Sequence, residues 1–325
     1  MNQSSSASLA AFADEIGTEG SICVVGGRTQ WEVGGRPAAG TREVSAPIGV
    51  VSHQPAEMIV RVLAGTPIAE VTEALATAGQ MVPLDPADPD RATVGGVLAV
   101  GHSGPRRLRY GPVRDTVLEV RFVTASGRVV KGGGPVVKNV TGYDLCRLMV
   151  GSLGTLGLLA EVVLRCYPVP PVSRWFRSES LIDPCQVAER LYRASSLLWD
   201  GNQTWVWLEG HPADVAAQAD QVLGTAFREV AGPPALSRRH RLSLPPAAFA
   251  RLLRSKGPVG NHWLAEVGTG TVHTDRPGEL AAALGMAWPP RLEPRVAALH
   301  RDLKTRFDPT GRLNPGRQVA LAASA

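Results

Sequence analysis

The sequence predicts an α+β fold built from two packed units, and three observations support this. The chain has 325 residues, which exceeds the size at which one hydrophobic core usually stops growing. Hydrophobic residues make up 44% and charged residues 19%, a balance typical of a globular protein rather than a disordered one. The 35 glycines and 26 prolines predict many tight turns, which disfavours a helical bundle.

Short apolar segments that end in turns organise the first half of the chain. Residues 1–20 are expected to form a frayed tail that leads into a helix. Apolar residues with helical spacing lie between Pro67 and Gly79, which predicts a helix over 68–78. Strands are expected at 22–25, 58–65, 117–124, 129–130 and 160–167. Residues 83–118 consist mostly of turn sequences, and a loop of this length is usually functional.

Prolines at 168, 170 and 171 mark a domain boundary. We therefore expect residues 1–168 to form the first domain and residues 169–293 a smaller α+β domain. Strands at 204–208 and 263–267 and a helix over 213–223 are expected in the second domain. Residues 294–325 begin with a predicted helix, 294–307, followed by two turns.

The charge pattern argues against nucleic acid as a partner. The net charge is only +5, and four of the 34 basic residues are lysine. The densest cluster consists of Arg106, Arg107, Arg109 and Arg114 in a glycine-rich loop without interleaved aromatic residues. A bound phosphate group suits this cluster better than a polymer, and a solvated arginine surface is the alternative.

The cysteines and the N-terminus indicate a reducing compartment. Cys23, Cys146, Cys166 and Cys185 show no CxxC spacing, so we expect free thiols and no iron–sulfur cluster in this chain. The first twenty residues lack the pattern of a secretion signal, and glycines and polar residues interrupt the most apolar stretch, 148–164. We expect a cytoplasmic protein without a membrane span, whose association with a membrane, if any, is through partners.

Common nucleotide-binding motifs are absent from the sequence. No GxxxxGK[ST] motif occurs, and no GxGxxG opens a helix with an acidic residue about 20 positions later. A Rossmann domain for NAD is therefore disfavoured.

A series of glycine-rich motifs resembles the FAD-binding domain of the vanillyl-alcohol oxidase, or PCMH-type, flavoproteins. In chain order the motifs are GGRT (26–29), MIVRVLAGTPIAEVTEAL (58–75), TVGG (93–96), RYGPVRD (109–115), VKNVTGYDL (137–145) and GSLGTLG (151–157). Together with GHSGPRR and a terminal FDPTGRLNPGR, the series looks most like the FAD-binding subunits of bacterial glycolate oxidases. The resemblance covers 22–168 and 294–317, and it implies a two-subdomain FAD-binding domain, a reduced cap domain at 169–293 and a C-terminal segment that returns to the FAD domain.

The resemblance also implies which residues hold FAD. The turn of Gly26, Gly27, Arg28 and Thr29, together with Thr93, Gly95 and Gly96, would line the pyrophosphate. The loop of Gly101, His102, Ser103 and Gly104 would lie beside the flavin, and Gly154, Thr155, Leu156, Gly157 and Leu159 would lie at the adenosine or flavin edge. Glycine permits such close backbone approach because it has no Cβ, although each glycine could also serve a turn alone.

Noncovalent FAD is expected, because the loop through which this family attaches flavin corresponds to 26–30, which has no histidine. The polar run with Lys138, Asn139, Thr141, Tyr143 and Asp144 has two interpretations. Asp144 or Thr141 as a helix cap is favoured over direct contact with a ligand.

The catalytic residues are not assigned by the sequence. Oxidation of a hydroxy acid requires a base for the hydroxyl proton and a cation for the carboxylate. Catalytic subunits of this family resemble one another in an HGHxGDGNxH segment, which is missing here. His273 is the nearest remnant, and an ordinary surface or packing role for it is favoured. No metal site is expected.

The function implied by the resemblance is that of an FAD-binding subunit in a glycolate-oxidase-like complex. The complex would oxidise 2-hydroxy acids such as glycolate and D-lactate and pass electrons to an iron–sulfur or quinone partner. Its other members would be a larger homologous flavin subunit and an iron–sulfur subunit. A stand-alone FAD-dependent dehydrogenase and a non-catalytic flavin-binding assembly subunit are the alternatives.

Overall fold

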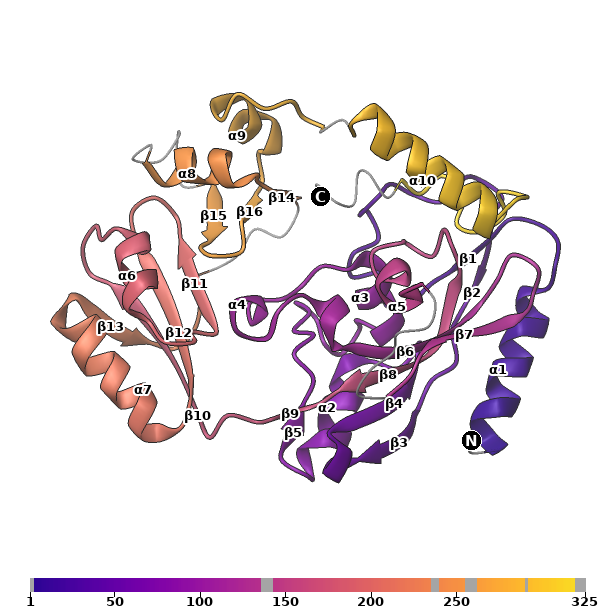
Figure 1. The fold of residues 1–325 in the computed structure, drawn as a ribbon, viewed down its shortest axis with the longest axis horizontal. Helices are drawn as coiled ribbons and strands as arrows, with labels where there is room; N and C mark the ends of the chain where they lie inside the picture. The colour runs from indigo at the N-terminus through magenta and orange to yellow at the C-terminus, as the bar shows by residue number, and fades with distance from the viewer. Residues whose placement is uncertain (1–2, 136–142, 235–239, 255–261, 290–291, 319–325) are drawn as a thin grey trace. The chain divides into compact units, whose positions relative to one another are not determined.

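The computed structural model describes residues 3–135, 143–234, 240–254, 262–289 and 292–318 (Figure 1). The chain divides into two compact units. Of the described residues, the first unit contains those up to Gly104, Pro112–Val169 and those from Leu292 onward, and the second contains those within Pro105–Gly111 and 170–291.

The first unit combines a five-stranded sheet with helices and two pairs of short strands. Its strands are β1 Ile22–Val24, β2 Arg42–Val44, β3 Val50–Gln54, β4 Ile59–Leu63, β5 Gln80–Met81, β6 Val117–Val123, β7 Val129–Gly133, β8 Leu158–Arg165 and β9 Tyr167–Pro168. Its helices are α1 Gln3–Ile16, α2 Ile68–Ala76, α3 Val94–Val100, α5 Leu145–Met149 and α10 Pro294–Phe307, with short 3-10 turns η1 Pro55–Glu57 and η2 Val113–Thr116.

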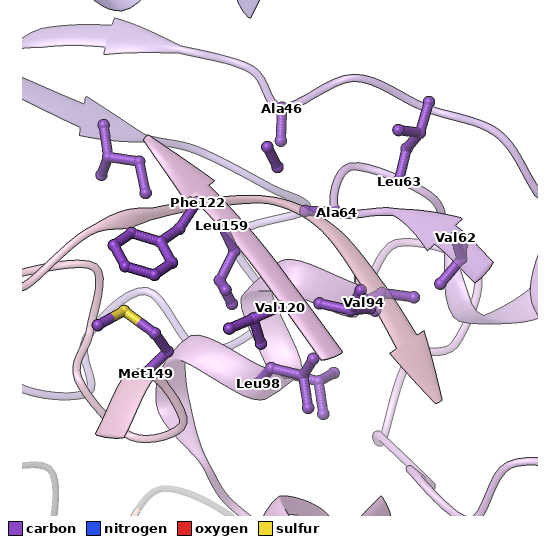
Figure 2. Packing of buried hydrophobic residues seen from close by; sticks show 14 of the residues in the cluster. Ala46, Val62, Leu63, Ala64, Val94, Leu98, Val120, Phe122, Met149 and Leu159 are labelled. Carbon is purple, nitrogen blue, oxygen red and sulfur yellow. The ribbon is translucent and has the colours of Figure 1, made fainter. Parts of the chain in front are cut away.

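The central sheet has the strand order β3-β4-β8-β6-β7, and every neighbouring pair is antiparallel. Its side chains alternate between an apolar face and a charged face, as the pleat of a strand requires. Figure 2 shows Val94 and Leu98 of α3 and Met149 of α5 packed against the apolar face, which carries Val120 and Phe122. All five residues are buried, so α3 and α5 owe their position to this core.

The opposite face of the sheet carries a buried network of charges. Arg61 Nη1 lies 2.9 Å from Glu119 Oε1 and 2.6 Å from Glu161 Oε1. Arg121 lies 3.3 Å from Glu119 and 3.5 Å from Glu161, and Lys131 Nζ lies 3.1 Å from Glu119 Oε2. Both carboxylates are fully buried, and burial of an unpaired carboxylate costs free energy. The neighbouring cations offset this cost.

Helix α1 lies beside β7 and β8 (Figure 1). The Ser5 hydroxyl donates a hydrogen bond to Glu161, and Leu9, Phe12 and Ile16 are buried in the core. The helix already begins at Gln3, so the sequence-based expectation of a frayed tail over residues 1–20 is wrong. Apolar residues at positions 9, 12 and 16 anchor this helix to the sheet.

The second unit contains a seven-stranded antiparallel sheet, ordered β13-β10-β12-β11-β15-β16-β14. Its strands are β10 Val172–Ser178, β11 Ser196–Trp199, β12 Thr204–Gly210, β13 Phe227–Val230, β14 His240–Ser243, β15 Trp263–Glu266 and β16 Thr271–Thr274. Its helices are α4 Arg107–Tyr110, α6 Pro184–Arg190, α7 Pro212–Gln218, α8 Pro246–Arg254 and α9 Pro277–Ala283, with short helical turns η3 Ala219–Leu223 and η4 Gly224–Ala226.

The two faces of this sheet differ in character. One face packs with residues of α6 to α9 in an apolar cluster that includes Val206, Leu208 and Leu252. The other face carries stacked Trp175 and Trp207, whose ring centroids are 5.0 Å apart, and polar side chains. We call this second side the polar face.

The segment Pro105–Gly111, which contains α4, packs on the polar face. Arg106 donates two hydrogen bonds to the Glu209 carboxylate, 3.0 and 2.9 Å long, and lies over the Trp207 ring. Arg109 donates to the carbonyl of Glu209. Arg107 donates to the Thr271 hydroxyl, so three arginines of the cluster noted in the sequence bind protein groups in this unit.

The predicted elements agree with the structure wherever the apolar pattern is regular. The helix expected over 294–307 is α10 with the same bounds, and the helix expected over 68–78 ends two residues earlier, at Ala76. Helix α3 was not predicted, because its residues fall within the turn-rich region 83–118. None of the helices in the described part of the chain has the length and apolar character needed to span a bilayer. All four cysteines are free.

The charged network predicts a specific response to acid. Burial raises the pKa of Glu119, but Arg61 and Lys131 outweigh it and hold that pKa below the ordinary value. The stabilisation from Glu119 is therefore complete above its unfolded pKa of about 4.3 and is lost as the pH falls through the lower pKa of the folded protein. Glu119→Gln is expected to lower the free energy of unfolding at pH 7 by about 3 kcal/mol.

Urea unfolding measured from pH 7 to pH 3 tests this expectation. The variant should lose less stability than the native protein across that range. Glu73→Gln, on the exposed side of α2, is the matched control and should retain the native pH dependence. An unchanged pH dependence in Glu119→Gln would contradict the proposed role of the network.

Candidate functional site

A cavity in the first unit gathers residues from distant parts of the chain. The contributing segments are the loop after β1, the turn between β4 and α2, helix α3, the loop before β8 and the C-terminal segment. The lining includes Val24–Trp31, Val33, Ala46, Ala64, Gly65, Thr93, Gly95, Gly96, Ala99, Val100, Ser152–Gly154, Leu158, Leu159, Asn314 and Arg317. Both apolar walls and backbone donors therefore face one space.

The loop after β1 supplies unpaired backbone donors to this cavity. The N–H groups of Gly26, Gly27, Arg28 and Thr29 donate to no other residue in the part of the chain that the structure describes. Arg28 is held in the left-handed region at a φ of 57°, unusual for a residue with a side chain. Successive N–H groups in such a loop can converge on an anion.

The glycines of this loop are required by the protein itself. A Cβ on Gly27 would stand 1.7 Å from the carbonyl oxygen of Arg91, and one on Gly26 would stand 2.3 Å from Thr93 Oγ1. The loop therefore packs directly on the segment that leads into α3. The sequence interpretation assigned these glycines to close approach of the cofactor, and the structure adds a close approach between two walls of the cavity.

Two guanidinium groups make the cavity cationic. Arg28 and Arg317 each lie 4.4 Å from the ring centroid of Trp31, and all three residues line the cavity. Arg28 also pairs with Glu43, which is half exposed. Burial lowers the pKa of Arg317, but an arginine keeps its charge at neutral pH.

The C-terminal segment contributes two residues that the sequence interpretation did not assign. Asn314 Nδ2 donates to the carbonyl of Leu153 over 2.6 Å, and Arg317 Nη1 donates to the carbonyls of Trp31, Val33 and Gly35. The terminal NPGR motif that contributed to the family resemblance was the available signal for these residues.

Nine of the sixteen predicted cofactor residues line the cavity. They are Gly26, Gly27, Arg28, Thr29, Thr93, Gly95, Gly96, Gly154 and Leu159. The other seven, Gly101, His102, Ser103, Gly104, Thr155, Leu156 and Gly157, are not among its lining residues.

Several of these seven have structural contacts instead. Ser103 Oγ accepts the N–H of Val113 over 3.1 Å, and Leu156 is buried in the core. A Cβ on Gly157 would stand 2.4 Å from the Phe122 ring. A role beside the flavin for residues 101–104 stays a prediction.

The cavity fits FAD on the evidence of these groups. The diphosphate of a dinucleotide needs several donors and a positive field, which the 26–29 loop, Arg28 and Arg317 supply. Its ring systems need apolar walls, which Val25, Ala46 and Leu159 supply.

Comparison with known proteins places the chain in a family. The model of an FAD binding domain matches residues 6–133. The glycolate oxidase subunit GlcE of Escherichia coli (strain K12) is 35% identical over 88% of this chain and 89% of its own length. The chain belongs to the family of this GlcE subunit. FAD is therefore its cofactor, and the expected PCMH-type α+β fold is confirmed.

Further relatives share only part of their length with the chain. The glycolate oxidase subunit GlcD of Bacillus subtilis (strain 168) is 37% identical over 32% of this chain and 22% of its own length. The mitochondrial D-lactate dehydrogenase [cytochrome] of Arabidopsis thaliana is 42% identical over 31% and 18%. A solved structure of alkyldihydroxyacetonephosphate synthase shares the fold, with a TM-score of 0.65 over 91% of this chain and 71% of that chain at 16% identity.

The remaining sequence-based candidates that the structure describes are not among the residues that line the cavity. The Asp144 carboxylate accepts the N–H of Arg147 over 3.0 Å at the start of α5, which confirms the helix-cap interpretation. Lys138, Asn139 and Thr141 lie outside the described residues, and Tyr143 is exposed. His273 lies in the second unit, where its Nε2 is 2.6 Å from Glu266 Oε1, so this histidine has a buried acidic partner.

The composition of the cavity wall predicts noncovalent FAD. None of the described residues that line it is histidine, cysteine or tyrosine, the side chains that could form a bond to flavin. Acid precipitation of the yellow protein should therefore leave all flavin absorbance in the supernatant. Flavin that stays with the precipitate would contradict this expectation, and a colourless protein that takes up no FAD would contradict the cavity assignment.

Gly96 offers a direct test of the cavity. A Cβ at this exposed position would stand 3.0 Å from Thr93 Oγ1 and, among the described residues, within 4 Å of no other group outside its own helix. Gly96→Val should therefore fold but occupy cofactor space, weakening FAD binding by about tenfold or more. Gly96→Ala should give a smaller loss, because its side chain is smaller.

Flavin content per folded protein and thermal unfolding measure these effects separately. Full flavin content in folded Gly96→Val would show that Gly96 serves only α3. A lower melting temperature with unchanged flavin content would lead to the same conclusion.

Proposed function

We propose that the chain is the FAD-carrying subunit of a complex that oxidises small 2-hydroxy acids such as glycolate or D-lactate. Similarity to the GlcE subunit over nearly the whole of both chains is the observation that carries the proposal. The cavity supports it, because its donors and cations suit a dinucleotide cofactor. The names of further relatives, a glycolate oxidase subunit and D-lactate dehydrogenases, point to the same substrate class.

The chemistry requires more than a cofactor cavity. Oxidation of a 2-hydroxy acid removes the hydroxyl proton and a hydride from the adjacent carbon and leaves a 2-oxo acid. Bound FAD supplies the acceptor for the hydride. In this chain the residues of the 26–29 loop, with Arg28 and Arg317, would hold the diphosphate, and Leu159 and Ala46 would exclude water.

The partners in this proposal are a larger, homologous flavin subunit and an iron–sulfur subunit. The match to the GlcD subunit covers 32% of this chain. We therefore expect each of the two subunits to contain a cofactor domain of the same kind. All four cysteines of this chain are dispersed and free, so we assign the electron-relaying cluster to another subunit.

Turnover by the isolated chain tests the proposal. The chain with its FAD is expected to oxidise glycolate and D-lactate negligibly, whereas a complex with the larger flavin subunit and the cluster protein is expected to be active. Reduction of an artificial electron acceptor, measured on both preparations at equal flavin content, distinguishes the two.

The same assay tests the alternative that the chain is a stand-alone dehydrogenase. Robust turnover by the isolated chain, reduced about 10²-fold or more in His273→Ala, would establish that function and overturn the proposed subunit role. A complex that is equally active without this chain's FAD would instead indicate an assembly subunit.

A further inference from the structure

Four polar side chains meet on the polar face of the second unit, where β14, β15 and β16 run side by side. The strand register pairs Glu266 with Thr271 and His273 with Arg241. Thr271 and Glu266 are buried, and Arg241 and His273 are half-buried. Arg107, from the Pro105–Gly111 segment of the same unit, reaches this group as the fifth member.

The carboxylate of this group is already engaged. Glu266 Oε1 lies 2.6 Å from His273 Nε2, and Glu266 Oε2 accepts the Thr269 hydroxyl over 3.1 Å. Burial raises the pKa of Glu266, but His273, Arg241 and Thr269 outweigh it and hold that pKa below the ordinary value. Glu266 is therefore ionised, and its two oxygens are bound to residues other than the arginines.

The arginines, in contrast, share one weak acceptor. Thr271 Oγ1 accepts from Arg107 Nη1 over 3.1 Å and from Arg241 Nη2 over 3.3 Å. The proton of the Thr271 hydroxyl has no acceptor among the described residues, and the buried Nε of Arg241 has no partner there either. The donor groups of Arg107, Arg241 and Thr271 therefore lie together, and the acceptor among them, Thr271 Oγ1, is already used by both arginines.

The charges of the group are also unbalanced. Arg107 forms no ion pair with a described residue. Arg241 interacts electrostatically with Glu266, but no hydrogen bond or ion pair joins these two side chains. Burial lowers the pKa of Arg241, the charge of Glu266 raises it and the charge of Arg107 lowers it again, and the guanidinium stays charged. Two cations and a hydroxyl donor held together in this way would be stabilised by an added anion.

We propose that Arg107, Arg241 and Thr271 form a binding site for the carboxylate of a small 2-hydroxy acid. A carboxylate can accept from both guanidinium groups and from the hydroxyl at once, because its two oxygens provide about four lone-pair sites. His273 Nδ1 makes no hydrogen bond to a described residue. This nitrogen would be the hydrogen-bond partner of the ligand's 2-hydroxyl group, while the arginines bind its carboxylate.

The choice of a 2-hydroxy acid as the ligand rests on the proposed function. The site itself rests on the geometry of Thr271 and the two arginines. Binding can therefore be tested without flavin reduction or turnover.

Calorimetric titration of the full chain under anaerobic conditions tests the site. Glycolate is expected to bind, acetate to bind several-fold more weakly because it lacks the hydroxyl, and the uncharged analogue glycolamide not to bind. Binding of glycolamide as tight as that of glycolate would overturn the proposal. Binding of inorganic phosphate tighter than that of glycolate would also overturn it, because the site would then be one for phosphate.

Three variants locate the site and one serves as the control. Arg241→Gln and Arg107→Gln are each expected to weaken glycolate binding about tenfold or more. Thr271→Val keeps the shape of a buried side chain and removes its hydroxyl, and a several-fold loss is expected. Arg174→Gln removes a guanidinium that pairs with Glu229 on the opposite face of the same sheet and should leave glycolate binding unchanged.

The outcomes separate this inference from the proposed function. Unchanged binding in folded Arg241→Gln and Thr271→Val would overturn the site, whatever the activity of the complex. Loss of binding only in variants with an altered melting curve would overturn it as well. If binding responds as expected but the complex oxidises no 2-hydroxy acid, the carboxylate site stands and the proposed function fails.

Discussion

The first unit depends on a buried arginine of the C-terminal segment that binds backbone carbonyls near the N-terminus and at Ala125. Arg312 is 4% exposed, and its guanidinium donates to the carbonyls of Ile16, Gly17, Glu19, Gly20 and Ala125 over 2.8 to 3.1 Å. Hydrogen bonds from a charged donor each contribute about 1.5–3 kcal/mol, although they are not additive here. The end of α1, the start of β1 and the C-terminal segment therefore hold one another in place.

The contacts of the C-terminal segment also determine the shape of the cofactor cavity. The C-terminal segment pairs with β1 through Ile22, and it carries Asn314 and Arg317 to the loops that line the cavity. The sequence predicted the turns at the chain end and the glycine loops, because both are local patterns. It did not predict that Arg317 binds the carbonyls of the 31–35 loop, since that contact joins residues more than 280 positions apart.

Local sequence patterns account for much of the fold but fail where tertiary packing overrides them. Helix α2 was predicted because its apolar residues recur with helical spacing. Helix α10 was predicted from the residues at its boundaries. Helix α3 was missed because Gly95 and Gly96 disfavour a helix, and here Thr93 caps it and burial of Val94 and Leu98 stabilises it. The charged face of the central sheet was likewise missed, since its ion pairs join three separate strands.

Counting acceptors distinguishes two kinds of arginine in this chain. Arg312, Arg317 and Arg106 donate to carbonyls or to a carboxylate, and each joins segments that would otherwise separate. Arg241 and Arg107 instead meet at a hydroxyl oxygen that is a poor acceptor for two cations. A donor left unpaired in a folded protein lowers stability, so such a group is compatible with a stable fold where a ligand supplies the missing acceptor. At the cofactor cavity, Gly26, Arg28 and Thr29 are exposed, so water can satisfy their N–H groups. There the donors favour an anionic ligand because they line one cavity together with the guanidinium groups of Arg28 and Arg317.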